Sequence, residues 1–310
     1  MLKFKPDVFV KPKFTDQNLP RFLTAEKQKT IAENIEVKGI GLHTGSKTSM
    51  HLKPAPVNTG YVFRLKKKGK IYSIKASYKN VKSTKLCTLI SDSLGNTIST
   101  IEHILSALYA FNVDNIYLDL DSNEVPVCDG SSREFVALLK KCGVKNQDSF
   151  KKFIKIKKIV EVKEGNKVVR VSPFDQTMIT CNVEYDHRCI GKQSISIMLT
   201  SELYESQICQ ARTFGFLKDV EKLRKSGLAL GGSLENAIVL DDNKVLNNNG
   251  LRYTDEFVRH KVLDFIGDIS LAGHRIIGSF YTSHTGHELN VKLLKEIFKS
   301  TDNWELISSN

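Results

Sequence analysis

The chain has 310 residues, of which 41% are hydrophobic and 26% charged, and its formal net charge is +12. This length allows two domains of ordinary size, and the composition is typical of a soluble globular protein. No apolar run approaches the roughly 18 residues of a membrane-spanning helix, which excludes that class. The positive charge predicts an anionic partner or surface: nucleic acid, acidic lipid or a phosphorylated substrate.

The N-terminal segment, residues 1–27, is rich in lysine and phenylalanine and lacks the continuous apolar core of a signal peptide. We expect an extension that is disordered at least in part. An organelle transit peptide stays open as an alternative, although Asp7 and Asp16 interrupt the segment and arginine is scarce. The six cysteines form no CxxC pair, which favours a reducing cytoplasm over a disulfide framework or a zinc ribbon.

Short alternating runs and helical spacings divide the chain into predicted elements. In the first half these are strands within residues 30–64, a helix over 99–111, a strand over 115–120 and a helix over 135–141. In the second half they are strands over 153–162, 167–171 and 178–183, helices near 219–226 and over 255–272, a strand over 276–282 and a helix over 290–299.

A polar, lysine-rich segment, residues 145–158, separates these two sets of elements and is interpreted as a linker. In both halves the strands come first and the helices follow. We therefore predict an α+β protein with two domains of similar layout, residues 28–147 and 148–310.

A carboxylate and an imidazole, Glu102 and His103, enter an otherwise apolar predicted helix. Two structural readings compete with a catalytic one. Ser99 and Glu102 fit a capping box, in which the glutamate bonds back to the helix start, and His103 could be a core histidine. The segment alone does not decide between them.

The predicted helix over 255–272 carries a narrow polar stripe on a mostly apolar surface. His260 and Asp264, four residues apart, point the same way and could bind one metal ion. Asp264 and Asp268 repel each other on one helix face, which suggests a cationic partner for each. The alternative is a solvated charged face on which Lys261 pairs with an aspartate.

Two further histidines, His284 and His287, lie in a turn before the last predicted helix. A catalytic zinc site needs three protein ligands and an open position. His103, His260 and Asp264 supply three ligands, and Glu102 could deprotonate the attacking water. His287 could protonate the leaving group, with Asp268 holding its ring in the charged form.

These residues belong to eight ordered segments that together resemble the UDP-3-O-acyl-N-acetylglucosamine deacetylase family, the zinc enzymes of lipid A synthesis. The resemblance runs from about residue 28 to the C-terminus. The segments are Gly39-Ile40-Gly41-Leu42-His43-Thr44-Gly45, Lys53-Pro54-Ala55-Pro56, Ser99-Thr100-Ile101-Glu102-His103, Val125-Pro126-Val127-Cys128-Asp129-Gly130-Ser131, Ala211-Arg212-Thr213-Phe214-Gly215-Phe216, Gly231-Gly232-Ser233, the helix from His260 to Asp268, and Gly286-His287-Glu288-Leu289-Asn290.

The resemblance implies two similar α+β domains with the active site in the cleft between them. It also implies one catalytic zinc ion (Zn2+) per chain, and the site does not require an oligomer. The implied roles are zinc ligation by His103, His260 and Asp264, general base for Glu102, general acid for His287 oriented by Asp268, oxyanion stabilisation by Thr213, and substrate contacts by Lys261, by Phe214 near the sugar and by His43 near the nucleotide end.

An insert at about residues 215–246 is implied to form a passage for the acyl chain. The predicted function is hydrolysis of the N-acetyl group of UDP-3-O-acyl-N-acetylglucosamine, with that UDP-linked sugar as the partner. The location is predicted to be cytoplasmic, with peripheral contact at the inner membrane left open for the basic cluster Lys66 to Lys70. The alternatives are a zinc deacetylase of another N-acetylated sugar and, remotely, a nucleic-acid-binding protein, although no such motif is present.

Overall fold

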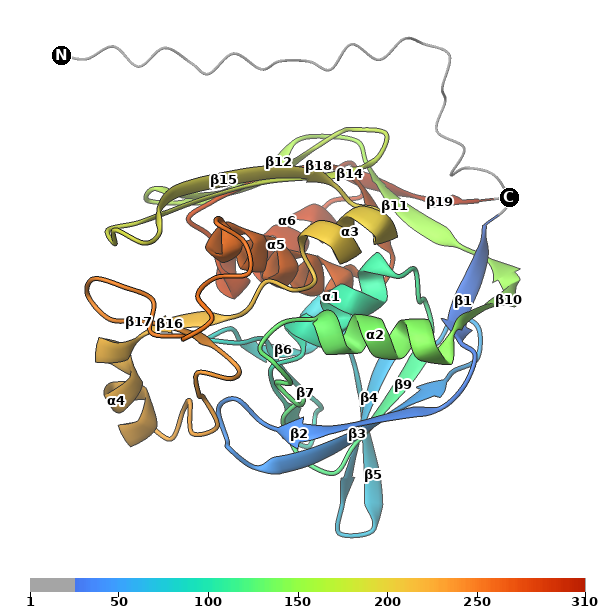
Figure 1. Cartoon of the computed structure of the whole chain (residues 1–310). Coiled ribbons are helices and arrows are strands. Elements are labelled where there is room, and N and C mark those ends of the chain that lie inside the picture. The colour runs from blue at the N-terminus through green and yellow to red at the C-terminus, as the bar shows by residue number, and fades with distance from the viewer. Residues whose placement is uncertain (1–25, 310) are drawn as a thin grey trace, which may run out of the picture.

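The computed structural model describes residues 26–309, so the expected N-terminal extension lies outside the described residues except for its last two positions. Helices fill the middle of the molecule and a β-sheet covers them on either side (Figure 1). This arrangement of helices and mixed sheets confirms the predicted α+β class. Within residues 26–309, no helix combines the length and the apolar character needed to cross a bilayer.

The first sheet, below the helices in Figure 1, comes from the first half of the chain. Its strand order is β2-β3-β9-β4-β5, with β4 and β9 parallel and the other neighbours antiparallel. Alternate residues of β3, such as Met50 and Leu52, are buried because successive side chains in a strand point to opposite faces. The strands of this half are β1 (Lys27–Ile31), β2 (Ile35–Ile40), β3 (Lys47–Pro54), β4 (Tyr61–Lys67), β5 (Lys70–Lys75), β6 (Val81–Ser83), β7 (Leu89–Ser91), β8 (Thr97–Ile98) and β9 (Ile116–Leu120).

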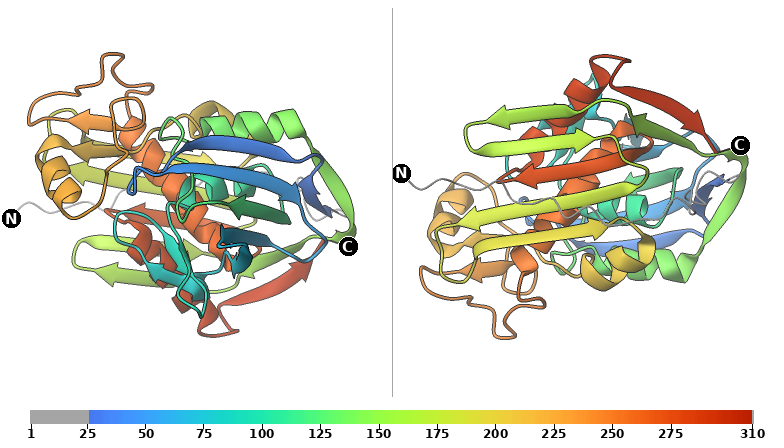
Figure 2. Two further views of the ribbon diagram at one scale, coloured as in Figure 1. Left: turned by 90° about the horizontal axis from the view of Figure 1, so that it is seen from below. Right: turned by 90° about the horizontal axis from the view of Figure 1, so that it is seen from above.

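The second sheet covers the opposite side of the helices and is seen face on in the right view of Figure 2. Its central strand, β18, pairs antiparallel with β13 and parallel with β11 and β14. The strands of this sheet are β11 (Lys152–Ile156), β12 (Val160–Glu164), β13 (Lys167–Ser172), β14 (Thr177–Tyr185), β15 (Gly191–Met198), β18 (Arg275–Ser283) and β19 (Trp304–Ser308).

Two helices from different halves of the chain, α1 and α5, cross at the centre of the molecule. Every residue of α1 is buried. A Cβ on Gly267 of α5 would lie 2.2 Å from the carbonyl oxygen of Glu102, so a residue without a side chain is needed at this crossing. The helices are α1 (Glu102–Ala110), α2 (Arg133–Cys142), α3 (Ser201–Gln207), α4 (Leu217–Lys225), α5 (Glu256–Ile269) and α6 (His287–Phe298), with short 3-10 helices η2 (Tyr78–Asn80) and η3 (Ser270–Ala272).

The linker interpretation of residues 145–158 is wrong, because these residues form most of β10 (Val144–Phe150) and all of β11. Strand β10 pairs with β1, so it ties the start of the described chain to its middle. All β10 side chains are exposed or half-buried, and the strand therefore has the polar composition of a loop. The division into two domains stays a prediction.

The predicted insert projects from one side of the molecule (Figure 1). It contains β16 (Phe214–Phe216), α4 and β17 (Ile238–Leu240), and the two strands pair in parallel. None of the α4 residues is fully buried. Backbone hydrogen bonds hold the insert to the first half of the chain. The N–H of Leu230 donates to the carbonyl of His43 at 3.1 Å, and the N–H of Gly231 donates to the carbonyl of Leu42 at 3.0 Å.

Candidate active site

A cavity of about 250 Å3 lies where α1, α5, the start of α6 and the insert meet. It is lined by all but one of the residues that the sequence predicts for the site; the exception, Asp268, lies directly behind His287. The predicted residues that line the cavity are His43, Glu102, His103, Thr213, Phe214, His260, Lys261, Asp264 and His287.

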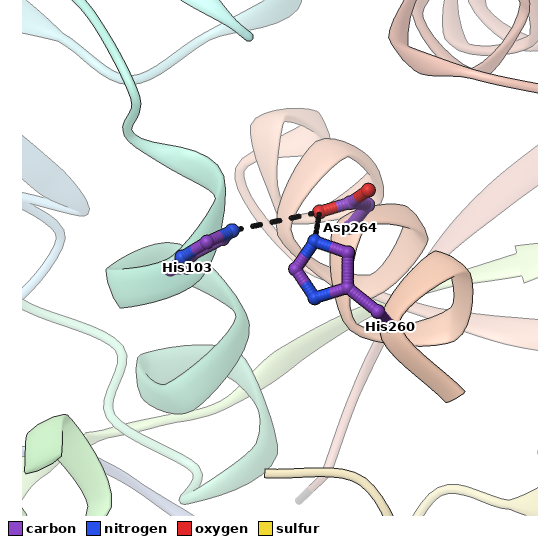
Figure 3. Close-up of side chains that lie close together, drawn as sticks. All are labelled: His103, His260 and Asp264. Carbon is purple, nitrogen blue, oxygen red and sulfur yellow. Dashed lines mark ion pairs between the residues drawn. The ribbon is translucent and has the colours of Figure 1, made fainter. Parts of the chain in front are cut away.

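Three buried side chains that line this cavity point toward one another (Figure 3). His103 comes from α1, whereas His260 and Asp264 come from successive turns of α5. Asp264 Oδ1 lies 3.7 Å from His103 Nε2 and 3.3 Å from His260 Nε2. One ligand atom from each residue lies within 4.8 Å of the others, so the trio could hold a metal ion.

The chemistry of these side chains fits a cation. Asp264 Oδ1 and His103 Nδ1 are buried and have no hydrogen-bond partner among the described residues. His260 Nδ1 donates to the carbonyl of Ala211 at 3.1 Å, which leaves Nε2 facing Asp264. A hydrogen bond from the ring nitrogen that does not bind the metal commonly orients a histidine ligand.

The protonation states of these three side chains also suit the binding of a metal ion. Burial, followed by the neighbouring His260, lowers the pKa of His103 to about 3, and burial lowers the pKa of His260 as well. Burial opposes the ionisation of Asp264, but His260 and Lys261 outweigh it and hold the pKa of Asp264 well below its usual range. Two neutral imidazoles and one carboxylate are the forms that bind a metal.

Glu102 does not form the capping box that was an alternative for this segment. Helix α1 has Ile101 at its N-cap and no side-chain cap. Instead, Glu102 Oε2 accepts a hydrogen bond from the backbone N–H of Thr88 at 3.1 Å, and Oε1 faces His287 Nε2 at 3.6 Å. Burial raises the pKa of Glu102 to about 7, although the charge of His287 opposes this.

His287 is held by a carboxylate on the side away from the cavity. Its Nδ1 donates to Asp268 Oδ2 at 2.8 Å, and Asn290 donates to the same oxygen at 2.8 Å. Burial alone would lower the pKa of His287, but Asp268 and Glu102 outweigh it and raise the pKa to about 10. His284 is hydrogen-bonded to Ser283 instead and lines a neighbouring cavity.

The polar stripe of α5 is not a solvated face. Asp264 and Asp268 are 4% and 0% exposed, and each has the cationic partner that their spacing suggests. Lys261 Nζ donates to Asp264 Oδ2 at 2.9 Å and lies 5.5 Å from the centre of the Phe214 ring. Lys261 therefore lines the cavity wall between the metal-binding trio and the insert.

One family of known proteins matches this chain. The model of the LpxC family, described as UDP-3-O-acyl N-acetylglycosamine deacetylase, matches residues 28–299. The chain belongs to this family.

Relatives named UDP-3-O-acyl-N-acetylglucosamine deacetylase are similar over nearly the whole LpxC-family region. The protein of Campylobacter lari is 49% identical over 282 residues, which are 91% of this chain and 95% of the relative. The proteins of Colwellia psychrerythraea and Haemophilus influenzae are 44% and 42% identical over 284 residues, 91% of this chain and 93% of each relative. These matches confirm the resemblance on which the sequence interpretation relied.

The sequence interpretation missed Thr88, which is hydrogen-bonded to two residues of the candidate site, Glu102 and Asp268. Thr88 is fully buried, and its hydroxyl donates to Asp268 Oδ1 at 2.6 Å. Its backbone N–H donates to Glu102, so one residue contacts both the proposed base and the carboxylate that holds the proposed acid. No local signal marks it, because Thr88 and Asp268 are 180 positions apart.

Glu124 was also missed, although it explains the segment Gly41 to Gly45 of the LpxC-family resemblance. The fully buried Glu124 accepts hydrogen bonds from the backbone N–H groups of His43 and Thr44, both at 2.8 Å. A Cβ on Gly41 would lie 2.2 Å from its carboxylate. The loop therefore wraps around this carboxylate and carries His43 to the cavity.

Proposed function

We propose that this chain is a zinc-dependent deacetylase that hydrolyses the N-acetyl group of UDP-3-O-acyl-N-acetylglucosamine to the free amine and acetate, an early step of lipid A synthesis. The observation that carries the proposal is the position of the Glu102–His287 pair, 3.6 Å apart, beside three converging metal-ligand side chains in one cavity. Membership of the LpxC family supports the substrate.

His103, His260 and Asp264 would hold the zinc ion. The chemistry that zinc supplies when bound by three protein ligands is Lewis acidity toward a carbonyl oxygen and a lowered pKa of water. Side chains of this protein carry out the proton transfers and stabilise the developing negative charge.

Glu102 acts as the general base. Its carboxylate takes a proton from the water that attacks the acetamide carbon, and the backbone N–H of Thr88 holds it in place. A pKa near 7 suits this task, because a base is most effective when its pKa lies near the working pH.

His287 acts as the general acid. It carries a proton that Asp268 and Glu102 stabilise, and it donates this proton from Nε2 to the leaving amine. When the carbon–nitrogen bond breaks, the acetyl group departs as acetate and the sugar keeps a free amine. Thr213 and Lys261, from the cavity wall, stabilise the negative charge that develops on the carbonyl oxygen.

The surroundings of the cavity suit a long substrate. A second cavity of about 370 Å3 adjoins the first, since Tyr185 lines both, and Lys167 and His284 give it a polar wall. We assign the sugar to Phe214, the nucleotide end to His43 and the acyl chain to the insert at residues 215–246, which includes the exposed Leu217 and Leu230. The site lies between two proposed domains, residues 28–147 and 148–310.

We place the enzyme in the cytoplasm, since all six cysteines are free. Contact with the inner-membrane surface is assigned to the basic tip of the β4–β5 hairpin, where Lys66 to Lys70 are exposed.

The test is acetate release from UDP-3-O-acyl-N-acetylglucosamine by the purified protein, before and after a chelator and again with substoichiometric zinc. Loss of activity with the metal and its return with zinc would support both reaction and cofactor. Substrates that lack UDP or the 3-O-acyl group form the comparison. Equal rates on these would favour a deacetylase of another N-acetylated sugar, and no acetate at any zinc level would contradict the proposal.

A further inference from the structure

A third cavity, of about 670 Å3, lies away from the candidate active site and shares no lining residue with it. Its wall comes from both halves of the chain, including β5 and η2 of the first half and β11 and β19 of the second. Residues 272–274, just beyond the C-terminal end of α5, close one side. This volume lies in the range of about 300–1,000 Å3 that small-molecule sites occupy.

Positive charge gathers at this cavity without a matching negative charge. Lys75, Lys79 and Lys152 line it, and none of them has a carboxylate within 4.0 Å among residues 26–309. The acidic lining residue Asp114 is already occupied, because it pairs with Lys151 Nζ at 3.3 Å and accepts from the backbone of Lys29 at 2.8 Å. All three lysine side chains are exposed, and an anion bound in the cavity would neutralise part of their charge.

The lysines lie close enough to influence a common neighbour. Partial burial, and then the charges of Lys152 and Lys75, lower the pKa of His274, which lines the same cavity. Like charges brought together in this way repel one another, and a bound anion would relieve that repulsion.

Aromatic side chains line the cavity beside these lysines, and Lys79 Nζ lies 5.9 Å from the centre of the Tyr78 ring. Tyr78 and Phe298 stack with ring centroids 5.0 Å apart and an angle of 12°, and Trp304 meets Phe298 edge-on at 5.2 Å. Aromatic rings favour stacking with another planar ring.

We propose that this cavity, bounded by Lys75, Lys152 and Trp304, binds a phosphorylated ligand that carries a planar ring, the chemistry of a nucleotide. The lysines bind the phosphates and the aromatic wall receives the ring. The site is separate from the one proposed for deacetylation, and its test does not depend on that activity.

Trp304 is the single tryptophan of the chain, so its fluorescence reports directly on this cavity. The experiment titrates the full-length protein with ADP, exciting tryptophan alone, and repeats the titration by calorimetry. Pyrophosphate, which lacks the ring, and adenosine, which lacks the phosphates, are the comparison ligands. We expect a saturable fluorescence change with ADP and weaker binding of both comparison ligands.

The double variant Lys75→Gln/Lys152→Gln should bind ADP about tenfold more weakly or worse, because two charge-assisted contacts are lost. Lys141→Gln/Lys145→Gln removes the same charge from exposed positions of α2 and β10 away from the cavity and should bind as the parent does. Three results would overturn the proposal: no heat or fluorescence change with millimolar ADP, equal ADP binding by both double variants, or equal binding of ADP and pyrophosphate.

Discussion

At the scale of single residues, hydrogen-bond partners distinguish the proposed base from the proposed acid in the candidate active site. Glu102 and His287 face each other at 3.6 Å in a buried cavity, yet their other contacts differ. Glu102 is held by a neutral backbone N–H, whereas His287 is held by the carboxylate of Asp268. One group is therefore suited to accept a proton and the other to donate one.

Glu102→Gln should lower kcat by about 10²- to 10⁴-fold, because the amide keeps the hydrogen bond from Thr88 but cannot accept the proton of water. Zinc binding should persist, since the three proposed ligands are unchanged. Steady-state acetate release and equilibrium dialysis with zinc measure the two effects. Glu288→Gln, on the exposed side of α6, is the matched control, and a full rate in Glu102→Gln would refute the role of base.

Asp268→Asn should move the alkaline limb of the kcat/KM profile to lower pH. Asp268 raises the pKa of His287, and the acid works only while protonated, so loss of the carboxylate lets His287 lose its proton at lower pH. The pH–rate profile of acetate release gives the measurement. Asp302→Asn, which alters an exposed pair with Lys158, should leave the profile unchanged. An unmoved limb in Asp268→Asn contradicts His287 as the acid.

Thr88→Val should lower kcat and destabilise the protein by about 1–3 kcal/mol, because Asp268 Oδ1 loses its buried donor. Thr88→Ser keeps the hydroxyl and should restore most of both properties. Denaturant unfolding and acetate release compare the two variants. If valine and serine behaved alike, the hydroxyl would have no positioning role.

At the scale of secondary-structure elements, the site depends on how closely α1 and α5 approach. His103 lies on one helix, and His260 and Asp264 lie on the other, so the crossing sets the distance between the ligand atoms. Gly267 permits the approach because its missing side chain leaves room for the backbone of Glu102.

Gly267→Ala should destabilise the fold by about 1–3 kcal/mol and weaken zinc binding, since the new Cβ would lie 2.2 Å from the Glu102 carbonyl oxygen. Separation of the helices would move His103 away from its two partners. Urea unfolding and a zinc competition assay test both effects. Retention of wild-type zinc affinity and stability would show that the crossing tolerates a side chain.

At the scale of the whole molecule, a metal ion bound by both α1 and α5 would link distant parts of the chain. Zinc that binds only the folded protein stabilises it, by about 2.7 kcal/mol at a free concentration of 100 times Kd. Chelation should therefore lower Tm, and zinc should restore it. Thermal unfolding of the parent and of Asp264→Ala gives the comparison. The variant should respond weakly, and an equal response would place the stabilising ion elsewhere.

The strand and helix pattern could be predicted wherever burial is periodic along the chain. The helix around Phe135 and the strand around Met50 are examples, because one side of each element is apolar and buried. Strand β10 could not be predicted in this way. Its polar, largely exposed residues resemble a loop, and only pairing with β1 makes them a strand.

By itself, the sequence determined the α+β class, the shared helix face of His260 and Asp264, and the eight segments that indicate the family. These follow from local periodicity and residue identity, which need no knowledge of distant contacts. The tertiary structure alone decided that α5 meets α1 at Gly267, that Thr88 holds Glu102 and Asp268, and that Glu124 organises the loop carrying His43. Those contacts join residues far apart in the chain, so they depend on how the sheets and helices pack, which no local pattern records.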